Sequence, residues 1–189
     1  TTEIYTLSLH DALPIYQPGH RRDQVRLPEF FLMSIEAKLT ELGIELPPPP
    51  PAVAAYEPWM RTGNLVITSG QLPWRDGEMA FAGRCGEEIT EDQGYQAARQ
   101  CAINAIAQIK AAAGDLDRVR RIVKVDGYVH TAPGFRGHPQ VLNGASELFN
   151  AVFGERGRHA RLAIGVDEMP LNAAVQICVT AEIEDYPIS

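Results

Sequence analysis

Hydrophobic residues recur along this chain with two periods, one typical of helices and one typical of strands. The helical period covers residues 90–113 and 140–153, and a capping box of Thr90 with Gln93 predicts where the first helix begins. Alternating or short apolar runs predict five strands. These strands are 64–69, 79–82, 121–130, 160–166 and 175–184, the second being the expected hairpin partner of the first.

The order of these elements, β-β-α-β-α-β-β, predicts an α+β fold with both helices on one face of a sheet. The other face is then left with a set of side chains too polar for a core and too small for an ordinary solvated surface. That set is Arg161, Ala163, Gln176, Cys178 and Thr180. We expect such a face to be buried against another subunit, with polar groups lining a shared cleft.

The first 32 residues differ from the rest, because they contain three prolines and no sustained helical or strand period. We expect residues 1–32 to be foreign to the fold or a disordered extension, and residues 33–189 to form one domain. Between its first short helix and its first strand, the domain contains an unbroken run of five prolines, Pro47–Pro51. This run predicts a stiff polyproline II linker.

The composition of the chain argues against several classes of protein. The chain is 45% hydrophobic and 22% charged with a net charge of −7, a balance that argues against a nucleic-acid partner. Its three cysteines and five histidines are scattered, so we predict no metal site and no disulfide framework, and a structural role for His159. No apolar run is long enough to span a membrane, and we expect a cytoplasmic protein without a membrane partner.

Three segments resemble the reactive intermediate deaminase family (Rid/YjgF, also called endoribonuclease L-PSP). They are Tyr56–Pro73 with its RTGNLVITSGQLP run, RIVKVDGYVHTAPGF at Arg121–Phe135, and GRHARLAIGVDEMPLNAAVQICVTAEI at Gly157–Ile183. The resemblance covers about residues 33–187 and is closest to the longer branch, which has LGIELPPPP near its start. It implies a chorismate-mutase-like fold, homotrimers with pockets between subunits, and hydrolysis of 2-imino acids to 2-keto acids and ammonia without any metal or organic cofactor.

The resemblance also implies a set of site residues. Arg161 matches an arginine that clamps the substrate carboxylate, a role for which a planar guanidinium is well suited. The implied substrate-binding positions are Tyr56, Ser69, Gly70, Ala163 and Asn143. From pattern alone, Tyr56 is equally well explained as a half-buried aromatic residue, and Asn143 as a cap or packing residue.

One position departs from the family pattern. Gln176 stands where active deaminases of the family carry a glutamate that holds the attacking water, and an amide cannot accept a proton near pH 7. Two hypotheses therefore stay open, an imine deaminase with Arg161 and Gln176 as catalytic residues, and a non-catalytic trimer that binds small carboxylates such as 2-keto acids. A ribonuclease is a third and weaker reading.

Overall fold

The computed structural model describes residues 33–52 and 54–184, so the extension expected at residues 1–32 lies outside the described residues. Three α-helices are present in this part, α1 (Ile35–Glu41), α2 (Glu91–Ala113) and α3 (His138–Phe153). The strands are β1 (Trp59–Thr62), β2 (Leu65–Thr68), β3 (Trp74–Arg75), β4 (Glu78–Met79), β5 (Val119–His130), β6 (Ala160–Val166) and β7 (Val175–Ile183). Short 3₁₀ turns occupy Leu116–Arg118, Gly154–Gly157 and Pro170–Asn172.

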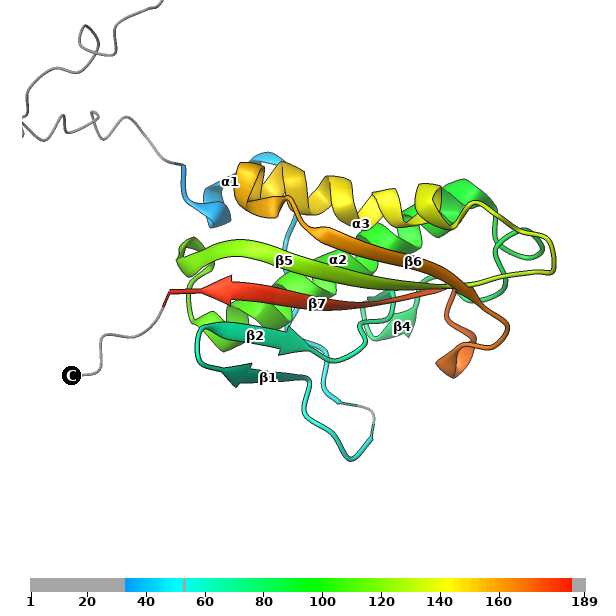
Figure 1. Cartoon of the computed structure of the whole chain (residues 1–189), viewed down its shortest axis with the longest axis horizontal. Helices are drawn as coiled ribbons and strands as arrows, with labels where there is room; N and C mark the ends of the chain where they lie inside the picture. Colours follow the sequence, from blue (N-terminus) through cyan, green and yellow to red (C-terminus); the bar gives the residue numbers. More distant parts are fainter. Residues whose placement is uncertain (1–32, 53, 185–189) are drawn as a thin grey trace, which may run out of the picture. The chain divides into compact units, whose positions relative to one another are not determined.

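Five strands form one mixed sheet in the order β1-β2-β7-β5-β6, in which only the β5–β6 pair is parallel. The two long helices α2 and α3 lie behind this sheet in Figure 1, so they cover one of its faces. The apolar side of α2 meets the odd-numbered residues of β7, all of which are buried, and α3 packs over β5 and β6. The predicted α+β class is confirmed, whereas the trimer remains a prediction.

The hairpin predicted at the start of the sheet is wrong in its pairing. The partner of β2 is β1, which precedes it across a two-residue turn at Gly63 and Asn64, and Gly63 adopts the left-handed backbone region there. Strand β4 pairs instead with β3, in a separate two-stranded ribbon closed by Asp76 and Gly77. Four residues give too short an alternation to identify the partner of a strand from sequence.

The two faces of β6 are also reversed from the prediction. Leu162 and Ile164 lie on the uncovered face with 38% and 41% of their surface exposed, whereas Arg161 and Ala163 face the helices. Helix α3 approaches this edge strand so closely that a Cβ added to Gly165 would overlap the ring of His138. Large apolar side chains therefore do not fit under the helix, and small residues together with one long cation take their place.

Helices α2 and α3 pack at very short range. A Cβ added to Gly144 of α3 would overlap the backbone carbonyl of Tyr95 in α2. The side of α2 that faces the sheet is rich in buried alanines, which allows the same close approach on that side. No helix among the described residues has the length and apolar character required to cross a bilayer.

Candidate functional site

The predicted site residues separate into two groups. The first, which we call the arginine cluster, consists of Arg161 with Asn143, Ser146 and His159. The second, which we call the loop pocket, has a volume of about 370 Å³. It is lined by Tyr56, Ser69, Gly70, Leu72, Pro170, Leu171 and Gln176.

In the arginine cluster, helix α3 holds the guanidinium of Arg161 in a fixed position. Nη1 donates to Asn143 Oδ1 at 2.9 Å and to Ser146 Oγ at 3.1 Å, and Nη2 donates to the Pro139 carbonyl at 3.3 Å. No described residue accepts a hydrogen bond from Nε. The Nε–H and one Nη2–H remain, and together they form the edge that binds a carboxylate with two parallel hydrogen bonds. Ala163, two residues further along β6, lies on the same side of the strand and packs against the core.

His159 and Ser146 extend this network behind Arg161. His159 Nδ1 lies 2.6 Å from the Gly157 carbonyl, and because a carbonyl only accepts, Nδ1 carries the proton. Nε2 is then free to accept from the Ser146 hydroxyl at 3.0 Å, and the same hydroxyl oxygen accepts from Arg161. Burial lowers the pKa of His159 below its ordinary value of 6.5; the hydrogen bond to Gly157 opposes this shift, and the charge of Arg161 adds to it.

Sequence reasoning gave His159 a structural role and did not single out Ser146. One available signal was strand alternation, which places residues two apart on the same side and so places His159 beside Arg161. A second signal was helical spacing, because Asn143 and Ser146 are three residues apart and therefore neighbours on one face of α3.

In the loop pocket, Gln176 of β7 lies directly against Gly70. A Cβ added to Gly70 would overlap the Gln176 side-chain amide in its present position, so the absence of a side chain at Gly70 lets the amide lie against the backbone. The hydroxyl of Ser69 donates to the Glu57 carbonyl at 2.6 Å, and its backbone N–H donates to the Pro58 carbonyl at 2.9 Å. Ser69 thus fastens the segment that carries Tyr56 to the end of β2, beside Gln176.

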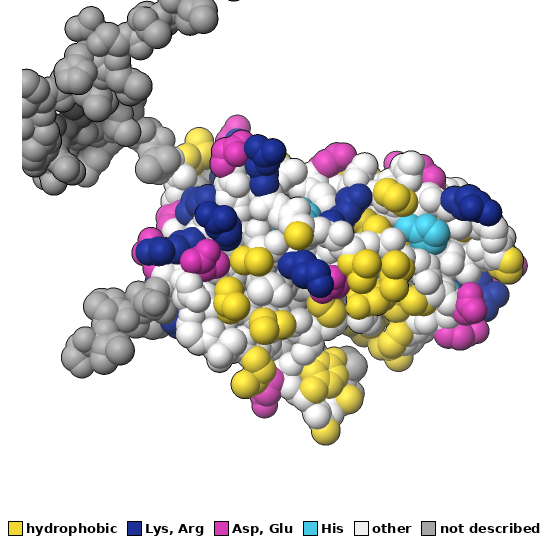
Figure 2. Space-filling model, viewed as in Figure 1, with side chains coloured by type: hydrophobic (Ala, Val, Ile, Leu, Met, Phe, Trp, Pro, Cys, Tyr) yellow, Lys and Arg dark blue, Asp and Glu magenta, His cyan; other side chains and the backbone are white. Residues whose placement is uncertain are grey.

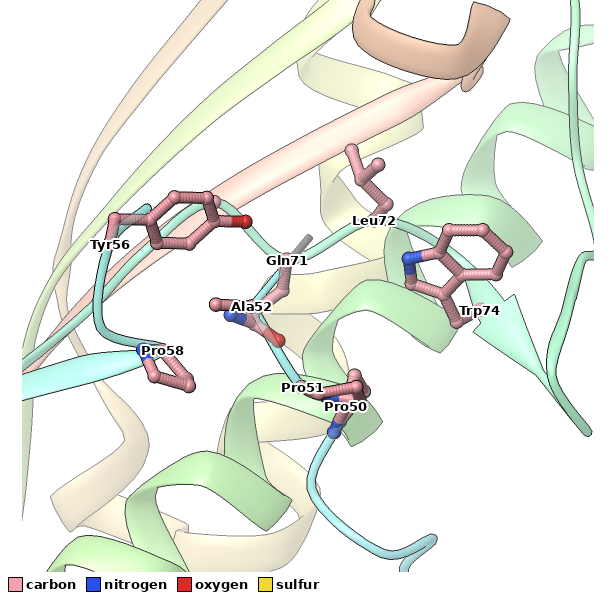
Figure 3. Close-up of a pocket in the computed structure, with 9 residues that line it drawn as sticks. Pro50, Pro51, Ala52, Tyr56, Pro58, Gln71, Leu72 and Trp74 are labelled. Atoms are coloured by element: carbon pink, nitrogen blue, oxygen red, sulfur yellow. The ribbon is translucent and has the colours of Figure 1, made fainter. Parts of the chain in front are cut away.

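The proline segment borders a smaller adjoining hollow, in which Tyr56 faces Pro50, Pro51 and Trp74 (Figure 3). Gln108 of α2 donates a hydrogen bond of 2.6 Å to the Pro50 carbonyl and fixes the segment on the helix. The polyproline run therefore acts here as a spacer held on the fold.

The arginine cluster and the loop pocket cannot contact one small ligand within a single chain. Arg161 points to the helix side of β6, whereas Gln176 points to the uncovered side of β7, and β5 lies between the two strands. Gln176 is level with Ile164, three residues along β6 from Arg161. Standard strand geometry separates the two positions by about 10 Å along the strands and about 10 Å across them. Within one chain the arginine cluster and the loop pocket are therefore two separate groups, which are called the two half-sites below.

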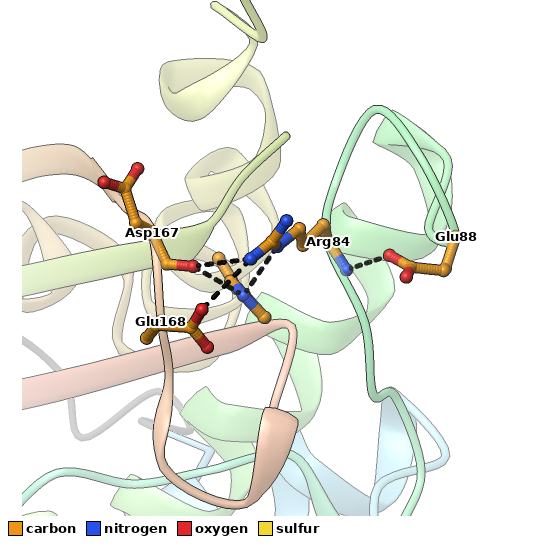
Figure 4. A network of polar contacts seen from close by, with 5 residues as sticks. Arg84, Glu88, Asp167 and Glu168 are labelled. Atoms are coloured by element: carbon orange, nitrogen blue, oxygen red, sulfur yellow. Dashed lines mark hydrogen bonds and ion pairs between the residues drawn. The ribbon is translucent and has the colours of Figure 1, made fainter. Parts of the chain in front are cut away.

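A second polar cluster, around Arg84, has a structural role (Figure 4). Its guanidinium donates to Glu168 Oε1 at 3.1 Å, to the Asp167 carbonyl at 3.3 Å and to His130 Nε2 at 3.3 Å, while its backbone N–H donates to Glu88 at 2.8 Å. These contacts tie the turn before α2 to the loop after β6, and they occupy the cation with protein acceptors.

The described thiols are poor nucleophiles. Burial, assisted by the charge of Glu91, raises the pKa of Cys85 to about 11, and burial raises the pKa of Cys101 as well. Cys178 lies on the same face as Gln176, and burial together with the charge of Asp126 raises its pKa. Raised pKa values favour the protonated thiol at neutral pH, so these shifts give no support for a thiolate nucleophile at the site.

A cluster of carboxylates is present at Glu36, Asp115 and Asp117, far from both half-sites in sequence. One oxygen of each carboxylate already has a protein partner. Asp117 accepts from the Ile35 backbone at 2.9 Å, Asp115 accepts from the Asp117 backbone at 2.8 Å, and Glu36 pairs with Lys110. We assign these carboxylates to the start of α1 and the turn after α2, and no metal role follows from them.

A mixed sheet with two helices on one face and an anchored arginine at its edge strand defines a chorismate-mutase-like protein of the α+β class. Residues 36–183 match the family described as "YjgF/chorismate mutase-like, putative endoribonuclease". The chain belongs to this family, and the resemblance drawn from its sequence is confirmed.

Several relatives match this chain over nearly the whole of their own length. Protein TCP17 of Trypanosoma cruzi is 41% identical over 152 residues, which are 80% of this chain and 95% of that protein. The crystal structure of Atu1372 from Agrobacterium tumefaciens, described as a protein of unknown function, is 44% identical with a TM-score of 0.74 over 79% of this chain and 92% of that one. A structure from Shewanella oneidensis titled as an endoribonuclease is 37% identical, with a TM-score of 0.78 over 80% and 100%.

Proposed function

We propose that this protein hydrolyses the C=N bond of 2-imino acids, yielding 2-keto acids and ammonia, at sites completed between copies of the chain in a homotrimer. The observation that carries the proposal is the guanidinium of Arg161, which three hydrogen bonds hold while its carboxylate-binding edge remains available.

In this proposal the substrate carboxylate binds the Nε–H and Nη2–H of Arg161 from one copy. The loop pocket of a second copy supplies Gln176, whose amide orients a water molecule toward the imine carbon, and main chain near Gly70 and Ala163 positions the imine. Water adds to the protonated imine, a proton passes from the added oxygen to nitrogen, and the C–N bond breaks as the C=O bond forms. Because a protonated imine is already electrophilic, positioning supplies much of the acceleration.

We include a second copy in the proposal because the two half-sites of one chain lie on opposite faces of the sheet. A symmetric trimer repeats the same contact three times, so each arginine cluster can meet a neighbour's loop pocket. No metal or organic cofactor is needed for this chemistry.

A second candidate is a non-catalytic trimer that binds small carboxylates. Gln176 favours it, because an amide holds water but cannot accept a proton near pH 7. The word endoribonuclease in the names of relatives does not lead us to propose RNA cleavage, since the net charge of −7 opposes binding of phosphates.

One assay separates the two candidates. 2-Iminopropanoate is generated with an amino-acid oxidase, and the release of pyruvate is followed with and without the protein. The deaminase proposal expects acceleration by the wild type and loss of both turnover and pyruvate binding in Arg161→Ala. Arg158→Ala is the matched control, because Arg158 is an exposed arginine that pairs only with Glu155 among the described residues.

The outcomes are distinct. Pyruvate binding without turnover in the wild type, with turnover appearing in Gln176→Glu, would establish the carboxylate binder. Unchanged pyruvate binding in Arg161→Ala would show that the site is elsewhere.

A further inference from the structure

The walls of the loop pocket around Gln176 are uncharged. Besides Gln176, Ser69 and Gly70, the lining consists of Tyr56, Leu72, Pro170 and Leu171. A charged group enclosed by these side chains would lose its hydration without gaining a counter-ion, whereas an apolar group would be removed from water.

Leu171 is the least expected member of this wall. It has 58% of its surface exposed, and its backbone adopts the left-handed region at φ 56° and ψ 24°, where side chains other than glycine and asparagine are disfavoured. Neither the exposure nor the conformation stabilises the isolated chain. A strained and exposed leucine at the mouth of a pocket indicates a contact with something outside the chain.

The connection between β6 and β7, which carries Leu171, is held in place by hydrogen bonds on both sides. The Ala173 N–H donates to the Pro170 carbonyl at 3.1 Å, and the Gly83 N–H donates to the Asn172 carbonyl at 2.8 Å. Beneath it, Leu72, Met169 and Ala173 form a small buried cluster of their own. The apolar wall is therefore preformed, and it can select among ligands rather than adapt to each of them.

We infer that the loop pocket selects ligands whose side chain is apolar and larger than a methyl group, and that Leu171 is the residue that sets this selectivity. The inference rests on the proposed function, because it places the carboxylate of the same ligand on Arg161 of a neighbouring copy. It adds the substrate class, 2-imino acids and 2-keto acids with branched aliphatic side chains.

Binding of 2-keto acids tests this selectivity whether or not Gln176 supports turnover. Calorimetry on the full-length protein compares pyruvate, 4-methyl-2-oxopentanoate and 2-oxoglutarate. We expect 4-methyl-2-oxopentanoate to bind about 10-fold or more tightly than pyruvate, in line with what added methylene groups contribute in an apolar pocket. We expect 2-oxoglutarate to bind more weakly than pyruvate, because its second carboxylate meets no cation in the pocket.

Leu171→Asn is the diagnostic variant, since asparagine tolerates the left-handed backbone and the substitution does not threaten folding. We expect it to reduce the preference for 4-methyl-2-oxopentanoate to about threefold or less while pyruvate affinity changes by less than about twofold. Met33→Asn is the matched control, because Met33 is similarly exposed at 51% but precedes α1 and does not line the pocket, and it should keep the wild-type preference. Native mass spectrometry verifies that both variants keep the wild-type assembly.

Each result has one meaning. Binding of all three acids with no preference for the branched one, or an unchanged preference in Leu171→Asn, overturns the inference and leaves the proposed function intact. Absence of both binding and turnover with every acid overturns the proposed function and, with it, the inference.

Discussion

At the scale of single residues, the proposed chemistry depends on how precisely one cation is held. Arg161 reaches its position through acceptors on a different element, and the strongest of these by distance is Asn143 at 2.9 Å. Hydrogen bonds to charged groups contribute more than those between neutral groups, about 1.5–3 kcal/mol each. An arginine that loses such a partner spends less time in the orientation that receives a carboxylate.

We therefore expect Asn143→Ala to weaken pyruvate binding about 10-fold, the effect of losing one charge-assisted hydrogen bond. Calorimetric titration with pyruvate measures the change. Asn150→Ala is the control, since Asn150 is an exposed asparagine on the same helix, and it should bind as the wild type does. Equal affinities for the two variants would mean that Asn143 does not position Arg161.

His159 gives a second prediction, in its dependence on pH. Burial lowers the pKa of this histidine in the folded protein, so the unfolded chain takes up the proton first as the pH falls. The stabilisation is fully present above pH 6.5, decreases as the pH falls below 6.5, and is lost by the lower pKa of the folded state. Urea unfolding at pH 7.5 and 5.5 should show a smaller decrease in stability for His159→Gln than for the wild type. An identical decrease in both proteins would contradict this assignment.

The site residues that the sequence predicts come from a family resemblance, chiefly Arg161 and Gln176. The sequence pattern missed Ser146 and Leu171, because a serine within a helix and a leucine in a loop have ordinary structural explanations. It also placed Arg161 and Gln176 on one face of the sheet. Alternation predicts which residues of one strand share a face, but it does not determine which of the two faces the helices cover at an edge strand.

At the scale of elements, the predictions succeeded where periodicity was long. The two long helices were expected at 90–113 and 140–153 and lie at Glu91–Ala113 and His138–Phe153. The strand expected at 160–166 has those bounds. The short strand β1 escaped notice, and the packing distance between the two helices is a tertiary property that no local pattern reports.

That packing distance leads to a prediction at Gly144. In an exposed helix a glycine-to-alanine change stabilises by about 1 kcal/mol, but here the added methyl group would overlap the Tyr95 carbonyl of the neighbouring helix. We expect Gly144→Ala to reduce the free energy of unfolding by about 1–3 kcal/mol, the usual effect of overpacking. Urea denaturation at pH 7.5 measures it, and any stabilisation would show that the helices can separate without cost.

At the scale of the whole molecule, the uncovered sheet face is the feature that a single chain leaves unexplained. Figure 2 shows hydrophobic side chains gathered on this face, with charged side chains beside them as well as at its margins. The exposed apolar residues of its strands are Met60, Ile67, Leu162 and Ile164. Apolar surface of this kind indicates contact with another protein surface, and under the proposed function that surface belongs to a second copy of this chain.

Mixed assemblies test this arrangement directly. Arg161→Ala removes one half-site, and Gly70→Leu blocks the other by filling the loop pocket beside Gln176. Each variant alone should fail to bind pyruvate. If the site forms between copies, equal co-expression of the two variants should restore about a quarter of the wild-type sites, because each parent contributes half of each surface at random.

Calorimetric stoichiometry counts the sites, and native mass spectrometry should show assemblies of about three times the 20.8 kDa chain. Mixed assemblies of that mass with no restored sites would mean that both groups act within one chain or that they act separately. The physical separation of Arg161 and Gln176 across the sheet argues for restoration.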